Sequence, residues 1–165
     1  MDMITLKIKD RTYGMRKMPP IKGAAFGIKV ANLVSKVLSA EGTLPVLQNL
    51  QKRFTSSNEA EDGKNQELDA KQAMTIGQAL IYLIGNVDPE AVDKIFKEAF
   101  SWEVYYGSQR LSNEAAFEEH FSQFPGDLYV VAAWATYNHV KDFFTGLGDG
   151  LTAFTANSGL KVPKQ

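Results

Sequence analysis

The stretch from Phe117 to Phe144, FEEHFSQFPGDLYVVAAWATYNHVKDFF, decides how the rest of this chain has to fold. It contains a helical segment with phenylalanines on one face, a break at Pro125-Gly126 and a second helical segment. Residues 128–135 of that second segment include no charged residue, so this part of the helix must be surrounded by other elements. The sequence therefore predicts a core helix near the carboxyl end, covered by the earlier parts of the chain.

The bulk composition indicates one globular domain. The chain has 165 residues, of which 44% are hydrophobic, and its formal net charge is -1. This length predicts a single domain over residues 1–150, and the polar, glycine-rich end predicts a flexible tail over residues 151–165. The even charge balance gives no reason to expect a nucleic-acid partner, which would need a clustered basic surface.

The sequence also does not indicate a membrane protein or a protein held together by disulfides. The start, MDMITLKIKD, lacks the apolar region of a signal peptide. No apolar run approaches the roughly 20 residues that span a bilayer. The sequence has no cysteine, which excludes disulfides and thiolate metal sites. We therefore expect a cytoplasmic protein with no membrane partner.

The amino-terminal residues alternate between apolar and polar side chains, as a half-buried strand does. Ile4, Leu6 and Ile8 form the apolar face. Asp10-Arg11 predicts a turn, and residues 12–15 predict the returning strand. Because an isolated hairpin is marginally stable in water, this hairpin must pack on helices.

Apolar residues at helical spacing dominate the rest of the chain. Asp88-Pro89 predicts an N-cap followed by a proline in the first turn, and Asp127 predicts the N-cap of the last helix. The polar run at residues 55–70 predicts a mobile acidic loop, and residues 102–106 predict a short extended segment. The fold class is mainly α (α+β), a bundle of about five to six helices with the amino-terminal hairpin packed on it. The predicted helices cover residues 21–40, 44–54, 71–84, 89–100, 114–124 and 128–147.

Three lysines on the first predicted helix are open to two interpretations. Lys22, Lys29 and Lys36 are seven residues apart and share one face. Lysines in such a pattern usually form a solvated stripe. The alternative is a surface for an acidic partner.

No group of residues forms a catalytic, cofactor or metal constellation, so the sequence does not predict an enzyme. The two histidines, His120 and His139, have too few suitable neighbours for a metal site and are interpreted as structural. The glycine-rich residues 146–150 lack the Lys-Ser/Thr of a phosphate loop.

Aromatic residues near the carboxyl end are the candidates for partner binding. Aromatics at helical spacing usually indicate core, and this is the favoured interpretation of Trp134. Phe143 and Phe144 are adjacent, so one helix face cannot bury both equally, and one of them is a candidate for an interface. The predicted partner-binding residues are Trp134, Tyr137, Phe143, Phe144 and Leu147.

The order of these parts resembles the tail assembly chaperones of long-tailed, siphovirus-like bacteriophages. The similarity covers roughly residues 3–145, and the acidic loop at 55–70 is a departure from the pattern. A short strand, a proline and a helical body come first in both. The closing motif of that family is represented here by Glu119-His120-Phe121, Gly126-Asp127-Leu128, Trp134, Asn138 and Phe143-Phe144.

The resemblance implies a non-enzymatic role. Such chaperones bind the long helical tape measure protein, keep it soluble, and leave as tail tube subunits polymerise around it. It further implies self-association, a place in the cytoplasm of the infected bacterial host, absence from the mature virion, and in many members an extended form made by frameshifting. The alternative is a structural tail or head-tail subunit that stays in the virion. A tube subunit of that kind would be dominated by strands.

Overall fold

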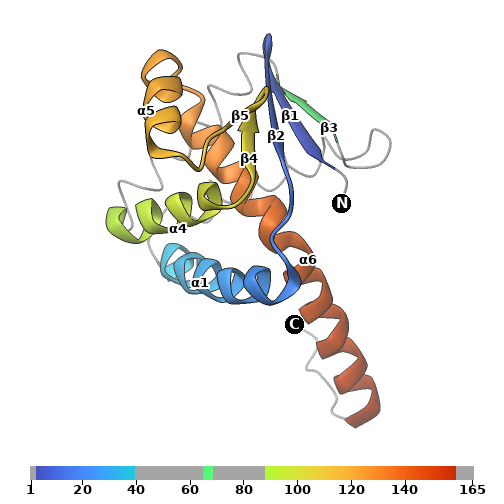
Figure 1. Ribbon diagram of the computed structural model, residues 1–165. Coiled ribbons are helices and arrows are strands. Elements are labelled where there is room, and N and C mark those ends of the chain that lie inside the picture. The colour runs from blue at the N-terminus through green and yellow to red at the C-terminus, as the bar shows by residue number, and fades with distance from the viewer. Residues whose placement is uncertain (1–2, 40–64, 69–87, 159–165) are drawn as a thin grey trace.

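The computed structural model of the protein describes residues 3–39, 65–68 and 88–158 (Figure 1). Within these ranges a five-stranded sheet lies beside four helices. The strands are β1 (Ile4–Ile8), β2 (Arg11–Met15), β3 (Asn65–Leu68), β4 (Val104–Tyr106) and β5 (Gln109–Arg110). The helices are α1 (Pro20–Ser39), α4 (Pro89–Ser101), α5 (Glu114–Gln123) and α6 (Leu128–Ser158).

The sheet has the strand order β3-β1-β2-β4-β5. β1 and β2 form the predicted antiparallel hairpin, in which Leu6 is opposite Tyr13. The turn lies one residue earlier than predicted, because Ile8 pairs with Arg11 and Lys9 takes a positive φ of 56°. β4 adds antiparallel to β2, and β3 adds parallel to β1.

The α+β class is confirmed, and the described residues contain four helices, fewer than the five to six expected for the chain. The predicted helices at 44–54 and 71–84 lie outside the described residues. The elements also do not form a plain bundle, since a sheet builds one side of the core. The predicted acidic loop at 55–70 lies outside the described residues except for β3, which is a strand. β3 forms there because its backbone N–H and C=O groups pair with those at the edge of β1 that β2 does not cover.

α6 is the central helix of the core, as predicted from residues 128–135. Trp134 is completely buried, and it belongs to one cluster with apolar residues of β1, β2, β4, α1, α4 and α5. In Figure 1 the first half of α6 runs behind the other elements, between α5 and α1. The buried residues of this helix segment are Val130, Val131, Ala132, Trp134 and Ala135.

Local signals in the sequence predicted the elements before α6 well. The Asp88 carboxylate accepts hydrogen bonds from the Glu90 and Ala91 N–H groups at 3.1 and 3.2 Å, as an N-cap does. Asn113 caps α5 in the same way through the Ala116 N–H. The extended segment after α4 is confirmed as β4, whose Val104 is fully buried.

The last helix is longer than predicted. α6 continues to Ser158, so residues 151–158 of the predicted tail are helical, and residues 159–165 lie outside the described residues. No proline occurs between Leu128 and Pro163, so none interrupts the helix in this range. Asn138 of the same helix is buried at 4% exposed, and its Nδ2 donates to the Trp134 carbonyl oxygen at 2.9 Å.

Candidate partner-binding surfaces

The structure distributes the five predicted partner-binding residues over different environments. Trp134 is fully buried, so its contribution to binding can only be indirect, through the position of α6. Tyr137 and Phe143 are half-buried. The side chains of Phe144 and Leu147 lie outside the described structure, although both residues belong to α6. In Figure 1 the carboxyl-terminal part of α6 extends beyond the other described elements.

Phe143 packs against α1 at a glycine. A Cβ atom added to Gly27 would lie 2.5 Å from Cδ1 of the Phe143 ring, which is closer than real atoms approach. Gly27 is therefore the residue that lets the aromatic ring reach the backbone of α1. This contact explains why Phe143 is partly covered by its own chain rather than fully available to a partner.

Replacing Gly27 with alanine is expected to lower the free energy of unfolding by about 1 kcal/mol. Overpacking costs about 1–3 kcal/mol, and the better helix propensity of alanine recovers roughly 1 kcal/mol. Gly23→Ala is the matched control, since its added Cβ meets its nearest atom at an ordinary 3.5 Å. Urea denaturation should show that Gly23→Ala leaves the free energy of unfolding unchanged or raises it. Equal effects of the two variants would contradict the proposed contact.

Asp127 is the centre of a buried polar cluster that joins β2 to the start of α6. Its carboxylate accepts from Arg11 Nε at 2.6 Å, from Arg11 Nη2 at 3.0 Å and from the Tyr13 hydroxyl at 2.7 Å. The Arg11 guanidinium also lies 4.6 Å above the centroid of the Phe124 ring. Asp127 occupies the predicted N-cap position, with its carbonyl oxygen accepting from the Val131 N–H, but its side chain is used for this long-range contact.

His120 extends the same cluster. Its Nε2 lies 3.0 Å from the Tyr13 hydroxyl. Because the single hydroxyl hydrogen of Tyr13 is donated to Asp127, Nε2 of His120 must carry the hydrogen that it donates to the Tyr13 oxygen. Burial lowers the pKa of His120, the Asp127 charge opposes this shift, and the Arg11 charge acts in the same direction as burial. Burial and the bond to Asp127 raise the pKa of Tyr13. These directions describe a neutral structural histidine, in agreement with the sequence interpretation.

His139 bridges two other elements. Its Nδ1 accepts from the Met18 N–H and its Nε2 donates to the Ala99 carbonyl oxygen, both at 3.2 Å. Burial lowers the pKa of His139 to about 4, and the charge of Lys17 acts in the same direction. The ring is therefore a neutral link between the entry to α1, α4 and α6. In the described part of the chain, no three His, Asp or Glu side chains are grouped as metal ligands would be.

The three lysines of α1 have partners within the chain. Lys29 pairs with Glu98 at 2.8 Å, and Lys36 lies 4.0 Å from the Asp88 carboxylate. Lys22 lies 4.7 Å from the centroid of the Trp102 ring. The stripe is solvent-exposed, as one interpretation required, but it also runs along the seam between α1 and the α4 region.

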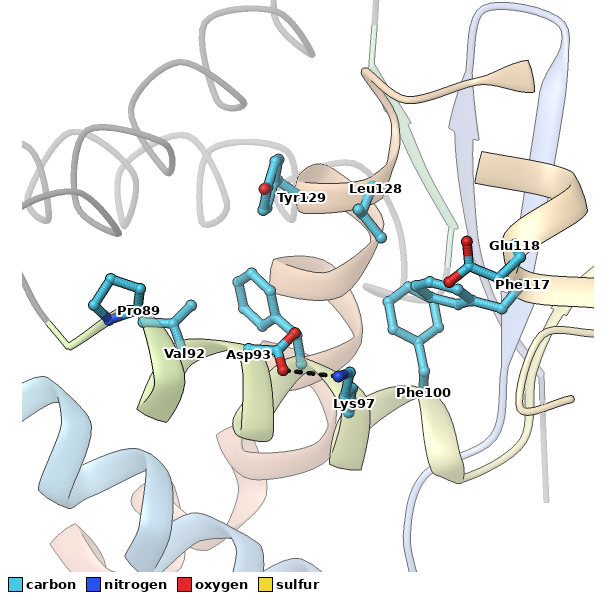
Figure 2. A pocket seen from close by; sticks show the side chains of 10 residues that line it. Pro89, Val92, Asp93, Lys97, Phe100, Phe117, Glu118, Leu128 and Tyr129 are labelled. Carbon is cyan, nitrogen blue, oxygen red and sulfur yellow. Dashed lines mark ion pairs between the residues drawn. The ribbon is translucent and has the colours of Figure 1, made fainter. Parts of the chain in front are cut away.

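A groove between α4, α5 and α6 is a candidate surface in the part of the chain that the structure describes. Figure 2 shows residues of α4 along one side, Phe117 and Glu118 of α5 at one end, and Leu128 and Tyr129 of α6 facing them. We call this site the aromatic groove. Its volume is about 380 Å³, and its lining consists of Pro89, Val92, Asp93, Phe96, Lys97, Phe100, Phe117, Glu118, Leu128 and Tyr129.

Ring contacts fix the walls of the aromatic groove. Phe100 is buried at its base and meets Phe117 edge-on, with ring centroids 5.1 Å apart. Phe96 and Tyr129 form the second pair, 6.3 Å apart. Asp93 and Lys97 form an ion pair of 2.9 Å on the rim. An apolar base with charged groups at the edge is typical of a site for an amphipathic helix.

The sequence did not single out this groove. Phe96, Phe100 and Phe117 lie on two helices that the sequence predicts separately, and these helices meet only in the tertiary structure. A second exposed apolar surface was also missed: Ile21 and Ile28 of α1 are 86% and 56% exposed. Their spacing of seven residues was the available signal, but it does not tell an exposed face from a buried one.

Comparison with known proteins assigns the family. The family described as phage tail assembly chaperone protein, TAC, matches residues 9–151 of the 165. Comparisons with curated proteins and with solved structures give no significant match. None of the described helices is sufficiently long and apolar for a membrane span. The family suggests a non-enzymatic role and partners connected with the phage tail. The chain belongs to the phage tail assembly chaperone family, as its closing motif indicated.

Proposed function

We propose that this protein binds the tape measure protein and keeps it soluble while the phage tail is assembled. The family match supports a role in tail assembly. The aromatic groove is the observation that supports binding of a helical protein chain, because it offers a partly open apolar base bordered by charges. The exposed Ile21 and Ile28 add apolar surface that charged neighbours interrupt, as a soluble holding chaperone requires.

The proposed cycle takes place in the cytoplasm of the infected host. The chaperone leaves as tail tube subunits polymerise, and it is absent from the mature virion. It also associates with itself, and Phe143, Phe144 and Leu147 at the carboxyl end are proposed to contribute to that contact or to tape measure binding. A structural subunit retained in the virion remains the alternative. The described structure, with four helices and five short strands, is not dominated by strands as a tube subunit would be.

Co-expression tests the proposal. The tape measure protein of the same phage is produced alone and together with this chain, and its soluble fraction is measured. The chaperone should raise the soluble fraction severalfold and co-purify with the tape measure protein. Mass spectrometry of purified virions should lack the chaperone. A tape measure protein that stays insoluble in its presence, or stoichiometric chaperone in virions, would rule the proposal out.

A further inference from the structure

The aromatic groove lies in an acidic environment. The Lys97 pKa is raised first by its bond with Asp93 and then by the charges of Glu114 and Glu118. The carboxylates of Asp93 and Glu118 and the Lys97 ammonium line the groove with a net charge of −1 (two negative, one positive), and Glu114 adds a further negative charge one helical turn before Glu118 on α5. Asp93, Glu114 and Glu118 are all exposed, so their field reaches the solvent in front of the groove.

The apolar base is suited to side chains of a helix. Half-buried Phe96, Phe117 and Tyr129 line the groove, and Phe100 closes it from below. A helix lying in such a groove anchors itself through apolar residues spaced three and four apart. Its remaining face then lies next to the carboxylates of the rim.

We propose that the aromatic groove binds one amphipathic helix of the chaperone's client, with aliphatic residues on its inner face and Lys or Arg residues beside them. This inference rests on the proposed function, since the client is the protein that supplies the helix. The negative charge of the rim favours a helix whose flanking residues are basic. The same charge raises the rate at which the helix and the chaperone associate. An acidic helix would meet like charges and is rejected.

Two synthetic peptides of about 20 residues, long enough to form helix when bound, test the proposal. Both carry the same leucine stripe, and they differ only in having lysine or glutamate on the polar face. Binding to the full chain is measured by fluorescence anisotropy at low and high salt. The lysine peptide should bind at least about tenfold more tightly than the glutamate peptide, and salt should reduce the difference. Equal binding of the two peptides, or none of the lysine peptide, would overturn it.

Surface variants then locate the site without disturbing the core. Glu114→Lys combined with Glu118→Lys should weaken the lysine peptide by roughly five- to tenfold, as two rim charges are reversed. Glu119→Lys is the control, because Glu119 is an exposed residue of α5 that points to a different side of the helix from Glu114 and Glu118. Tyr129→Ala should weaken binding of the lysine peptide about tenfold or more. Tyr105→Ala, which changes a half-buried tyrosine of β4 outside the groove, should weaken it much less. If the two variants of either comparison lost the same affinity for the lysine peptide, the binding site would lie elsewhere.

The same variants separate this inference from the proposed function. If the doubly reversed variant still solubilises the tape measure protein fully, the groove is not the client site but the chaperone role stands. If the unaltered chain fails to solubilise it, the chaperone role fails whatever the peptides do. If the variants abolish self-association in light scattering and leave peptide binding unchanged, the occupant is a second copy and the inference is wrong.

Discussion

Replacing Asp127 with alanine is expected to lower the free energy of unfolding by about 3–5 kcal/mol, the cost of removing one partner from a buried ion pair. Asp127 and Arg11 are 9% and 12% exposed at their side chains, so water cannot replace the lost carboxylate well. The Tyr13 hydroxyl would lose its acceptor at the same time. The hairpin would then be left with a largely buried Arg11 cation whose remaining carboxylate partner is the exposed Asp10, and with a Tyr13 hydroxyl hydrogen that has lost its acceptor.

Chemical denaturation followed by circular dichroism measures this effect. Asp142→Ala is the matched control, because Asp142 also forms an ion pair, with Lys17, but its side chain is 67% exposed. The free energy of unfolding of that variant should fall by less than about 1 kcal/mol, because exposed ion pairs contribute little to stability. An Asp127→Ala variant as stable as the control would show that the cluster does not hold the hairpin on α6.

Acidification is expected to remove about 3 kcal/mol of stability through His139 alone. The folded state has a His139 pKa of about 4, against 6.5 for the free side chain. Above pH 6.5 the ring is neutral in both states and contributes no pH dependence. Between pH 6.5 and 4 the unfolded chain binds the proton and the folded chain does not, so stability falls as the pH falls. Each unit of pKa difference corresponds to about 1.4 kcal/mol.

Burial is the main cause of this low pKa, and the hydrogen-bond geometry gives a further reason for a neutral ring. Nδ1 already accepts from the Met18 N–H, so a proton on that nitrogen would place two donors against each other. Unfolding should be measured from pH 7 to pH 4 for the natural chain and for His139→Gln. The natural chain should lose about 3 kcal/mol more than the variant over this range, a difference that cancels the carboxylates common to both. Parallel pH profiles would contradict the assigned role of His139.

Much of the fold could be predicted because the signals are local. The alternation of Ile4, Leu6 and Ile8 fixed the first strand, and Asp88-Pro89 fixed the start of α4. The apolar residues 128–135 could only belong to a buried helix, which is where the structure has them. The family was likewise predictable, since its marks lie within one continuous stretch.

The candidate site could not be predicted to the same degree. Each wall of the aromatic groove belongs to a different helix, and no periodicity within one helix states which neighbour it will face. No local pattern indicated that Phe143, one of the two interface candidates, packs against Gly27, which lies on α1 far along the chain. In a sequence, a glycine usually indicates a flexible or turn-forming position. It does not indicate that an aromatic ring from a distant part of the chain packs against it.

The sequence by itself determined the first hairpin, the order of the four described helices, the central place of the last helix and the family, because propensity, capping and apolar spacing act between near neighbours. Only the tertiary structure decided the parallel pairing of β3 with β1, the use of the Asp127 carboxylate for Arg11 rather than for its own helix, and the meeting of three helix faces at the aromatic groove. These contacts join residues far apart in the chain. Their partners are selected by packing and by the need of buried polar groups for hydrogen bonds, which no local pattern records.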